Sequence, residues 1–199
     1  MKNIFLVLMF SIALSACSTL SVKTPVSQTS TPAWQTQSQK LLALSQWNIH
    51  GGIGIQQDQK GLNAAVRWTQ SRDQYDIYLY GPIGSGSVKI MGTQQHVRLD
   101  TADNRHREAT SAEELLLSET GWQIPVTNLM YWIRGIPIPN VPATQQLDPT
   151  GQHLSSLQQS GWEIKYLRFT TVHGLELPRK IVLNHASIKV KIVITQWNI

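Results

Sequence analysis

The side chains that could do chemistry in this sequence are one thiol, six imidazoles and a few neighbouring carboxylates. No Gly-x-Ser-x-Gly nucleophile elbow is present, and the glycine pairs Gly52/Gly54 and Gly84/Gly86 fit neither the dinucleotide nor the P-loop pattern. The imidazoles have no metal-ligand spacing such as His-x-x-x-His; they are His50, His96, His106, His153, His173 and His185. We therefore expect no enzyme activity, no cofactor and no metal site.

The neighbouring carboxylates of Glu113 and Glu114 have a structural interpretation. Ser111-Ala112-Glu113-Glu114 fits a capping box, with Ser111 as the N-cap and Glu114 at the third helical position. Acidic side chains in a first turn interact favourably with the helix dipole. We interpret both as capping and solvated groups, in a helix that Gly121 ends.

The only thiol, Cys17, follows Leu14-Ser15-Ala16 at the end of an apolar run that begins after Lys2. A charged start, a short apolar run and small residues before a cleavage site are typical of a secretory signal. The run is too short to span a bilayer, which takes about 20 helical residues. A cysteine after Leu-Ser-Ala resembles the lipobox of bacterial lipoproteins, in which the thiol is lipidated and becomes the mature N-terminus. An ordinary cleaved signal with an incidental cysteine is the alternative.

This pattern predicts three segments: a signal peptide at residues 1–16, a lipidated flexible tether at 17–33, and a folded domain at 34–199. The tether is rich in Ser, Thr, Gln and Pro and cannot bury enough surface to fold. An aspartate after the cysteine would resemble the signal for inner-membrane retention, so Ser18 favours the outer membrane, with the domain facing the periplasm. A single cysteine allows no intrachain disulfide.

The chain carries a formal net charge of +5, but its cations are spread along the sequence. Proteins that bind nucleic acid usually gather them on one face, so we expect no nucleic-acid partner. Contact with anionic lipid and an ordinary solvated surface both account for the basic bias.

Hydrophobic periodicity predicts a mainly β chain of the α+β class. Apolar and polar residues alternate in many short runs, which predict antiparallel strands at about 46–55, 63–68, 75–80, 87–91, 97–100, 154–158, 162–171, 180–184 and 188–197. Helices are expected at about 34–44, from Ser111 to Gly121, and at 126–134, the last being followed by a Pro-rich loop. This order predicts a curved sheet or open barrel with a helical cover.

The seven tryptophans suggest what lies under that cover. Trp47, Trp68 and Trp162 fall on the apolar faces of predicted strands, and Trp132 falls in the last predicted helix. Core packing explains any one of them. Together, a bulky apolar sheet face and a detachable cover favour an apolar binding cavity.

A turn at residues 81–86 places a large aliphatic side chain at a hairpin tip. Pro82 fits the second turn position, and Ile83 takes the third, which favours type I. The tip could fold back onto the domain or contact a membrane.

Three segments resemble the LolB family of outer-membrane lipoproteins. They are Trp68-Thr69-Gln70 with residues 75–84, Ile124 to Leu129 with Trp132 to Pro137, and the strand-rich end near Trp197. The similarity covers nearly the whole mature chain. The family's loop usually reads Asn-Pro-Leu-Gly; here Gly81 and Ile83 stand in place of the Asn and the Leu.

The resemblance implies a half-open antiparallel β-barrel with a helical lid over an apolar cavity. It implies a receptor that accepts lipoproteins from a LolA-like periplasmic carrier, binds their acyl chains and inserts them into outer-membrane phospholipid, as a monomer. From strand alternation and helix spacing, the predicted cavity residues are Trp68, Ile77, Leu79, Leu129, Ile133, Trp162, Ile164, Ile192 and Ile194. Pro82, Ile83 and Gly84 are predicted to form a membrane-insertion loop.

Two other interpretations are open. An anchored β-domain could scaffold an envelope complex by protein contacts alone, and it would have a filled core and no bound lipid. A hydrolase of envelope polymers is the weaker alternative, because the catalytic motifs are missing.

Overall fold

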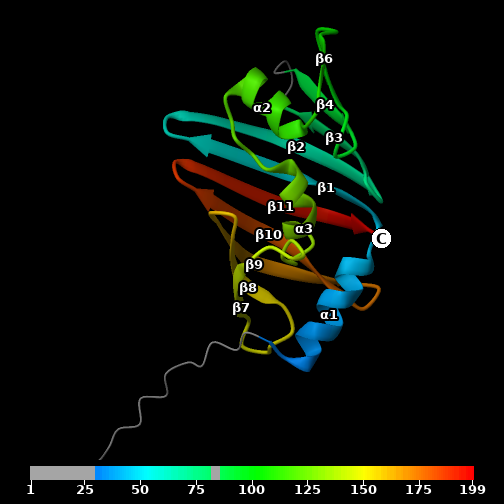
Figure 1. The fold of residues 1–199 in the computed structure, drawn as a ribbon, viewed down its shortest axis with the longest axis vertical. Helices are drawn as coiled ribbons and strands as arrows, with labels where there is room; N and C mark the ends of the chain where they lie inside the picture. The colour runs from blue at the N-terminus through cyan, green and yellow to red at the C-terminus, as the bar shows by residue number, and fades with distance from the viewer. Residues whose placement is uncertain (1–29, 82–85) are drawn as a thin grey trace, which may run out of the picture.

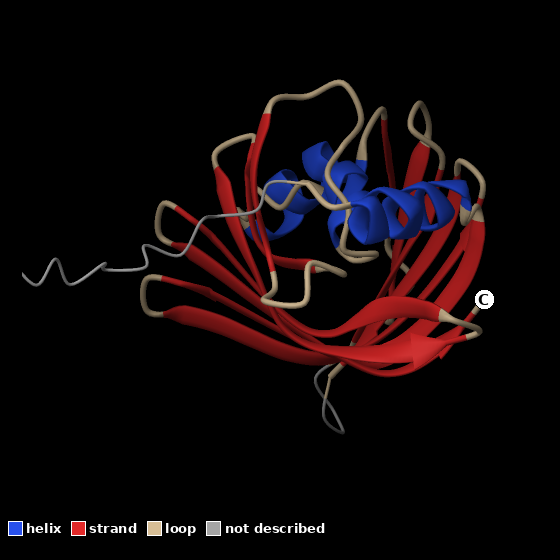
Figure 2. Ribbon diagram, turned by 90° about the horizontal axis from the view of Figure 1, so that it is seen from below, coloured by secondary structure: helices blue, strands red, loops and turns tan. Residues whose placement is uncertain are grey.

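The computed structural model describes residues 30–81 and 86–199 of the chain. In that part, one antiparallel sheet of 11 strands has the order β6-β5-β4-β3-β2-β1-β11-β10-β9-β8-β7. The strands are β1 (Gln46–Gln57), β2 (Lys60–Ser71), β3 (Gln74–Tyr80), β4 (Ser87–Gly92), β5 (Val97–Thr101), β6 (His106–Ala109), β7 (Ala143–Leu147), β8 (Leu154–Gln159), β9 (Trp162–Val172), β10 (Leu175–His185) and β11 (Ile188–Asn198). The sheet curves into a half-open barrel around the helices (Figure 1, Figure 2), so the expected fold class is confirmed.

The connection between the two edges of the sheet explains why helices cover its concave side. Strand β6 lies at one edge and β7 at the other. The chain between them carries α2 (Ala112–Thr120) and α3 (Val126–Trp132), which lie inside the curve of the sheet, as α1 (Pro32–Ala43) does (Figure 2). No helix in the described residues is both long and apolar enough to cross a membrane.

Cross-strand register builds the apolar concave face. Ile49 pairs with Trp68, Trp68 with Ile77, Ile77 with Ile90, and Ile90 with Leu99, so one apolar row crosses five strands. All five side chains are buried. Side chains alternate between the two faces of a strand. In each strand, the residues next in sequence to the row member therefore point outward, to the convex face.

The curvature of the sheet is helped by irregularities in the central strands. The β1–β11 register shifts between His50 and Gly51, where a Cβ would lie 2.1 Å from the Val193 carbonyl oxygen. The β9–β10 register shifts around Pro178 to Lys180. Bulges of this kind bend a strand and increase its twist.

Helix ends follow their capping residues. The Ser111 hydroxyl accepts a hydrogen bond from the Glu114 N–H at 3.1 Å, and α2 ends before Gly121, at φ 77°. The Glu114 carboxylate, however, accepts from the N–H and hydroxyl of Thr110 rather than completing the capping box at Ser111. Helix α1 begins at Pro32, two residues before the predicted start, because proline suits a first helical position.

Two strands were missed by the sequence analysis, and both are edges. Strands β6 and β7 have one neighbour each and are mostly exposed, so neither needs an apolar alternation. Strand β10 begins at Leu175 rather than near Lys180, because Pro178 interrupts the pattern at the bulge. Helix α3 ends at Trp132, and Gly135, at φ 81°, follows in the turn after it.

Candidate functional site

An apolar cavity of about 530 Å³ lies between the concave face of the N-terminal strands and the helices α2 and α3. Ligand pockets typically measure roughly 300–1,000 Å³ and are lined mainly by apolar side chains with few polar groups. Strand β1 contributes Ile49, Ile53 and Ile55, while Leu116 and Leu129 contribute from the helices. The cavity is therefore large and apolar enough for a hydrocarbon ligand.

Six of the nine residues predicted from the sequence line this cavity: Trp68, Ile77, Leu79, Leu129, Ile133 and Ile192. The structure places the other three, Trp162, Ile164 and Ile194, outside the lining, although all three are buried. Strand alternation put them on the correct face of the sheet, but only half of that face is open.

The C-terminal half of the concave face is filled by α3 and the segment after it. The Trp132 and Trp162 rings lie 6.2 Å apart, and the buried Tyr166 hydroxyl donates to the Trp132 carbonyl at 3.0 Å. Burial raises the pKa of Tyr166, so this hydroxyl stays a donor. The Gln159 amide accepts from the Trp132 indole N–H at 3.0 Å and donates to the Ile138 carbonyl at 3.1 Å. These contacts pack this half of the concave face with side chains of the fold itself.

The tryptophans divide between packing and lining. Trp68 lines the cavity and donates its indole N–H to the buried Gln70 at 3.1 Å, while its ring lies 5.3 Å from Trp47. The ring centroids of Trp47 and Trp197 lie 5.7 Å apart. The indole N–H of Trp197 donates to the Pro178 carbonyl. Among the four tryptophans singled out in the sequence, Trp47, Trp132 and Trp162 are core residues.

Glu113 joins the two helices that cover the cavity. Its carboxylate accepts from the N–H and the hydroxyl of Thr127, both at 2.8 Å, at the start of α3. Since the first N–H groups of a helix have no partner within it, the carboxylate caps α3 from α2. From its position in the sequence, Glu113 is expected to be a capping and solvated group in its own helix, whereas its carboxylate contacts the next helix.

Arg134 joins α3 to α1. Its guanidinium is buried and donates to the Met130, Leu41 and Leu44 carbonyls at 2.8, 2.9 and 2.8 Å. Two of these carbonyls are at the C-terminal end of α1, where a cation is favourable. Burial lowers the pKa of Arg134. The cover is thus held at both ends of α3.

One end of the cavity is polar, which the sequence analysis did not anticipate. Asp103 and Arg105, from the β5–β6 hairpin, line it together with Glu119 and Thr120 at the end of α2. A hydrogen bond from the Thr101 hydroxyl and the charge of Arg105 hold the pKa of Asp103 below its ordinary value, against the opposing effect of desolvation. These residues meet only because the short edge strand β6 forms.

The predicted lipidation site and insertion loop lie outside the described residues. Cys17, Pro82, Ile83 and Gly84 belong to residues 1–29 and 82–85. The residues that flank the loop, Gly81 and Gly86, line the cavity, and the Gly81 N–H donates to the Gly86 carbonyl at 3.3 Å.

Within the described ranges, no three His, Cys, Asp or Glu side chains gather as a metal site would require. The buried polar side chains Gln70, Arg134 and Gln159 have hydrogen-bond partners in the fold. The lining of the cavity is mostly apolar, as in a binding pocket.

Comparison with known proteins gives a consistent match along the chain. A family model described as Outer membrane lipoprotein LolB matches residues 45–197. A protein of Coxiella burnetii (strain RSA 493) named Outer-membrane lipoprotein LolB is 40% identical over 190 residues, covering 94% of this chain and 89% of that protein. A protein of the same name from Pseudomonas fluorescens is 34% identical over 194 residues, covering 97% and 94%.

Solved structures show the same fold at low sequence identity. A LolA superfamily protein from Nitrosomonas europaea superposes with a TM-score of 0.53 at 9% identity, covering 82% of this chain and 93% of that chain. A putative outer membrane lipoprotein-sorting protein domain from Vibrio parahaemolyticus gives a TM-score of 0.56 at 7% identity, covering 82% and 90%.

Proposed function

The chain belongs to the LolB family of outer-membrane lipoproteins, and from that premise we propose that it is an outer-membrane receptor for other lipoproteins. It accepts them from a LolA-like periplasmic carrier, holds their acyl chains in the apolar cavity and inserts them into outer-membrane phospholipid. The observation that carries this proposal is the cavity under α2 and α3, lined by Trp68, Ile77, Leu79, Leu129, Ile133 and Ile192.

The transfer needs no nucleotide, because each step can run downhill in apolar burial. Removing apolar surface from water is worth about 25 cal/mol per Å². A receptor that covers an acyl chain more completely than the carrier therefore takes it, and a bilayer that covers it more completely still receives it. The receptor acts as a monomer in this scheme.

Lipidation at Cys17 anchors the receptor, after a signal at residues 1–16 and through a tether at 17–33, with the domain of residues 34–199 facing the periplasm. A single acyl chain binds a membrane only marginally, whereas two or more bind stably. The one cysteine of the chain, its position after Leu14-Ser15-Ala16 and the names of the relatives support this anchor. Ser18, in the place of an aspartate after the cysteine, supports an outer-membrane location for the anchored protein.

The cavity proposal is tested with two half-buried leucines. Leu79→Gln places an amide in the lining, whereas Leu175→Gln places one at a half-buried position outside it. We expect Leu79→Gln to lower the transfer of acylated lipoprotein from carrier to receptor at least tenfold, since the amide is left without partners against hydrocarbon, and Leu175→Gln to transfer normally. Equal transfer by both variants, each folded by circular dichroism, contradicts a lipid-binding cavity.

The loop proposal concerns delivery rather than binding. Pro82, Ile83 and Gly84 are proposed to enter the acyl boundary, supported by the position of Gly81 and Gly86 at the cavity. Full burial of one aliphatic side chain is worth about 1.5–3 kcal/mol, enough to orient a tethered domain. Ile83→Glu should still accept lipoprotein but fail to insert it into liposomes, because a charge resists hydrocarbon, whereas Ile83→Leu should insert normally. Insertion by Ile83→Glu at the wild-type rate refutes the loop's role.

The scaffolding alternative receives no support from the cavity, since a purely structural domain would have a filled core. Lipid analysis of the purified full-length protein separates the two: bound acyl chains beyond those of the anchor support a receptor, and their absence supports a scaffold.

A further inference from the structure

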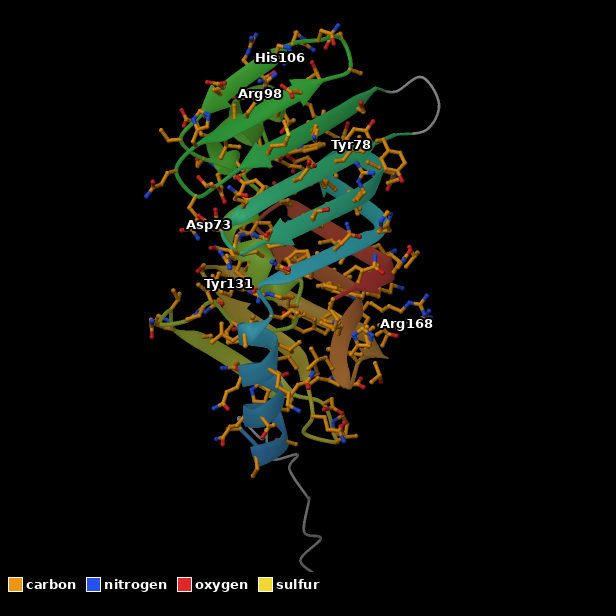
Figure 3. The ribbon with its side chains drawn as sticks, turned by 90° about the vertical axis from the view of Figure 1, so that its right-hand side faces the viewer. Asp73, Tyr78, Arg98, His106, Tyr131 and Arg168 are labelled. Atoms are coloured by element: carbon orange, nitrogen blue, oxygen red, sulfur yellow. The ribbon has the colours of Figure 1, made fainter. Side chains whose placement is uncertain are left out.

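The outer, convex face of the sheet carries a continuous row of apolar and cationic side chains. Cross-strand pairs place the row in the order Tyr80, Ala65, Gly52, Val193, Lys180 and Arg168, from β3 to β9. At about 4.8 Å between strands, it is roughly 24 Å long. Figure 3 shows Tyr78, beside this row, and Arg168 projecting on the same side of the sheet.

The apolar members of this outer row are exposed rather than packed. Tyr80 is 42% and Val193 39% exposed, and Leu167, next to Arg168, is 52% exposed. Between them, Gly52 and Ala65 border a shallow depression. Half of the six large apolar side chains exposed in the described residues are therefore on this face.

In the described residues, the cations at the centre of the outer face form no ion pair with an acid. Strands β1, β2 and β11 contain no Asp or Glu, whereas Arg67 and Lys191 are exposed on them. None of the ion pairs formed by the described residues involves Arg67, Lys180 or Lys191. The acid beside this group is Asp58, in the turn after β1, which lines a depression with Lys191. Farther out, Asp76 is paired with Lys89 at 3.0 Å, so cations outnumber acids at the centre of the face. The central face is thus positive, although the charges looked scattered in the sequence.

We propose that this outer row docks on an anionic phospholipid surface, an inference that rests on the membrane location in the proposed function. Lysine and arginine near such a surface attract headgroup phosphates, and their aliphatic stems cover apolar surface. Tyrosine favours the membrane–water boundary, where Tyr80 and Val193 would lie. The row lies on the convex face of the sheet. A broad lipid surface therefore suits it better than a partner protein that would have to insert a segment into a pocket.

Docking in this way orients the cavity. Gly81 borders both the cavity and the outer depression, so one end of the cavity lies beside the docked face. Helices α1, α2 and α3 lie on the opposite, concave side of the sheet (Figure 2). A carrier then approaches the helices while the outer row rests on the bilayer.

The test uses the full-length protein in vesicles of phosphatidylcholine, with or without phosphatidylglycerol. A spin label is placed by Asn63→Cys, at an exposed outer-face residue that borders the depression, and by Leu42→Cys, an exposed control on α1. Unsubstituted protein corrects for any label at Cys17, the only natural cysteine. Collision with a water-soluble paramagnetic reagent measures the exposure of each label.

We expect phosphatidylglycerol to protect the Asn63→Cys label several-fold and to leave the Leu42→Cys label exposed, with protection lost in high salt. Adding Lys180→Gln and Lys191→Gln should lower the docked-to-undocked ratio about 25-fold, at about fivefold per charge. Lys40→Gln, on α1, should leave the ratio unchanged. Equal exposure in both vesicles, protection without phosphatidylglycerol, or protection only when an acidic protein is added would each overturn the proposal.

The two proposals fail separately. Lipoprotein transfer from carrier to receptor in solution should be normal in Lys180→Gln/Lys191→Gln, because neither residue lines the cavity. Normal transfer without charge-dependent docking refutes the docking surface alone, while absence of transfer in the unsubstituted protein refutes the receptor.

Discussion

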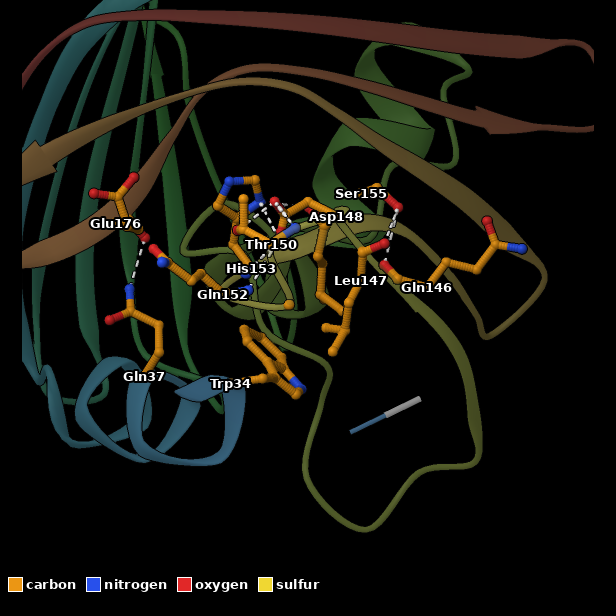
Figure 4. A network of polar contacts seen from close by, with 12 residues as sticks. Trp34, Gln37, Gln146, Leu147, Asp148, Thr150, Gln152, His153, Ser155 and Glu176 are labelled. Carbon is orange, nitrogen blue, oxygen red and sulfur yellow. Dashed lines mark hydrogen bonds and ion pairs between the residues drawn. The ribbon is translucent and has the colours of Figure 1, made fainter. Parts of the chain in front are cut away.

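At the scale of single residues, Asp148 organises the turn where the first helix meets the sheet (Figure 4). Its carboxylate accepts hydrogen bonds from the N–H and hydroxyl of Thr150 and from the N–H groups of Gln152 and His153. This turn also contains Gly151, whose carbonyl accepts a hydrogen bond at 2.5 Å from the hydroxyl of Thr31, the N-cap of α1. The Asp148 carboxylate therefore supports the turn that holds the start of α1.

A pH dependence follows for Asp148. Desolvation alone would raise its pKa, but the hydrogen bonds led by Thr150 outweigh it and lower the pKa to about 2. A lowered acid pKa contributes stability that is complete above the unfolded value, near 3.9, and is lost as pH falls to about 2. Allowing for solvent screening, unfolding by denaturant should show wild type losing about 1–2 kcal/mol more than Asp148→Asn between pH 4 and pH 2. Parallel losses in the two proteins would contradict this role.

At the scale of elements, α2 and α3 are coupled through one carboxylate of two that are adjacent in sequence. Glu113 accepts from Thr127 at the start of α3, whereas Glu114 accepts from Thr110 before α2. The Glu113 carboxylate therefore links the two helices of the cover to each other. Beyond the other end of α3, Arg134 links this helix to α1 by a hydrogen bond to the Leu41 carbonyl.

Glu113→Ala should loosen α3 without unfolding the sheet. Hydrogen bonds to a charged group are worth about 1.5–3 kcal/mol, so amide hydrogen exchange in the first turn of α3 should accelerate by about tenfold or more. Glu114→Ala is the matched control, because it should accelerate exchange at the start of α2 alone. If both variants leave α3 equally protected, the coupling is absent.

At the scale of the whole molecule, the sheet divides into a filled half and an open half. Trp132, Trp162 and Tyr166 occupy the concave face near β9, while the face of β1 to β5 is left for the cavity. A protein that keeps such a space open gives up packing contacts that would stabilise it. This organisation suggests that stability and lipid binding can be separated.

Ala64→Leu should separate them. Ala64 lines the cavity and its neighbour Ala65 points to the outer face. Added methyl groups at Ala64 should maintain the free energy of unfolding or raise it by about 0.5–2 kcal/mol, while lowering the uptake of lipoprotein from the carrier. Ala65→Leu should take up lipoprotein normally, and the pair is compared by equilibrium unfolding and by transfer in solution. Undiminished uptake by a folded Ala64→Leu protein would count against the cavity as the acyl site.

The elements whose pattern comes from burial on one face were predictable from the amino-acid sequence. The apolar alternation through Ile49, Trp68 and Ile77 predicted strands and the cavity side of each, and Ser111 and Gly121 predicted the ends of α2. The motifs around Trp68, Ile124 and Trp132 were enough to identify the family. Such features are local, because each depends on a few neighbouring residues.

Contacts between distant segments, by contrast, determine how those faces are used. Trp162, Ile164 and Ile194 alternate like the lining residues, but α3 and the segment after it cover them. The polar cavity end at Arg105 depends on an edge strand that has no apolar pattern, and the outer row depends on pairing between β1 and β11. The physical reason is the same in each case: alternation states which face a side chain occupies, whereas contacts between segments distant in sequence decide what meets that face.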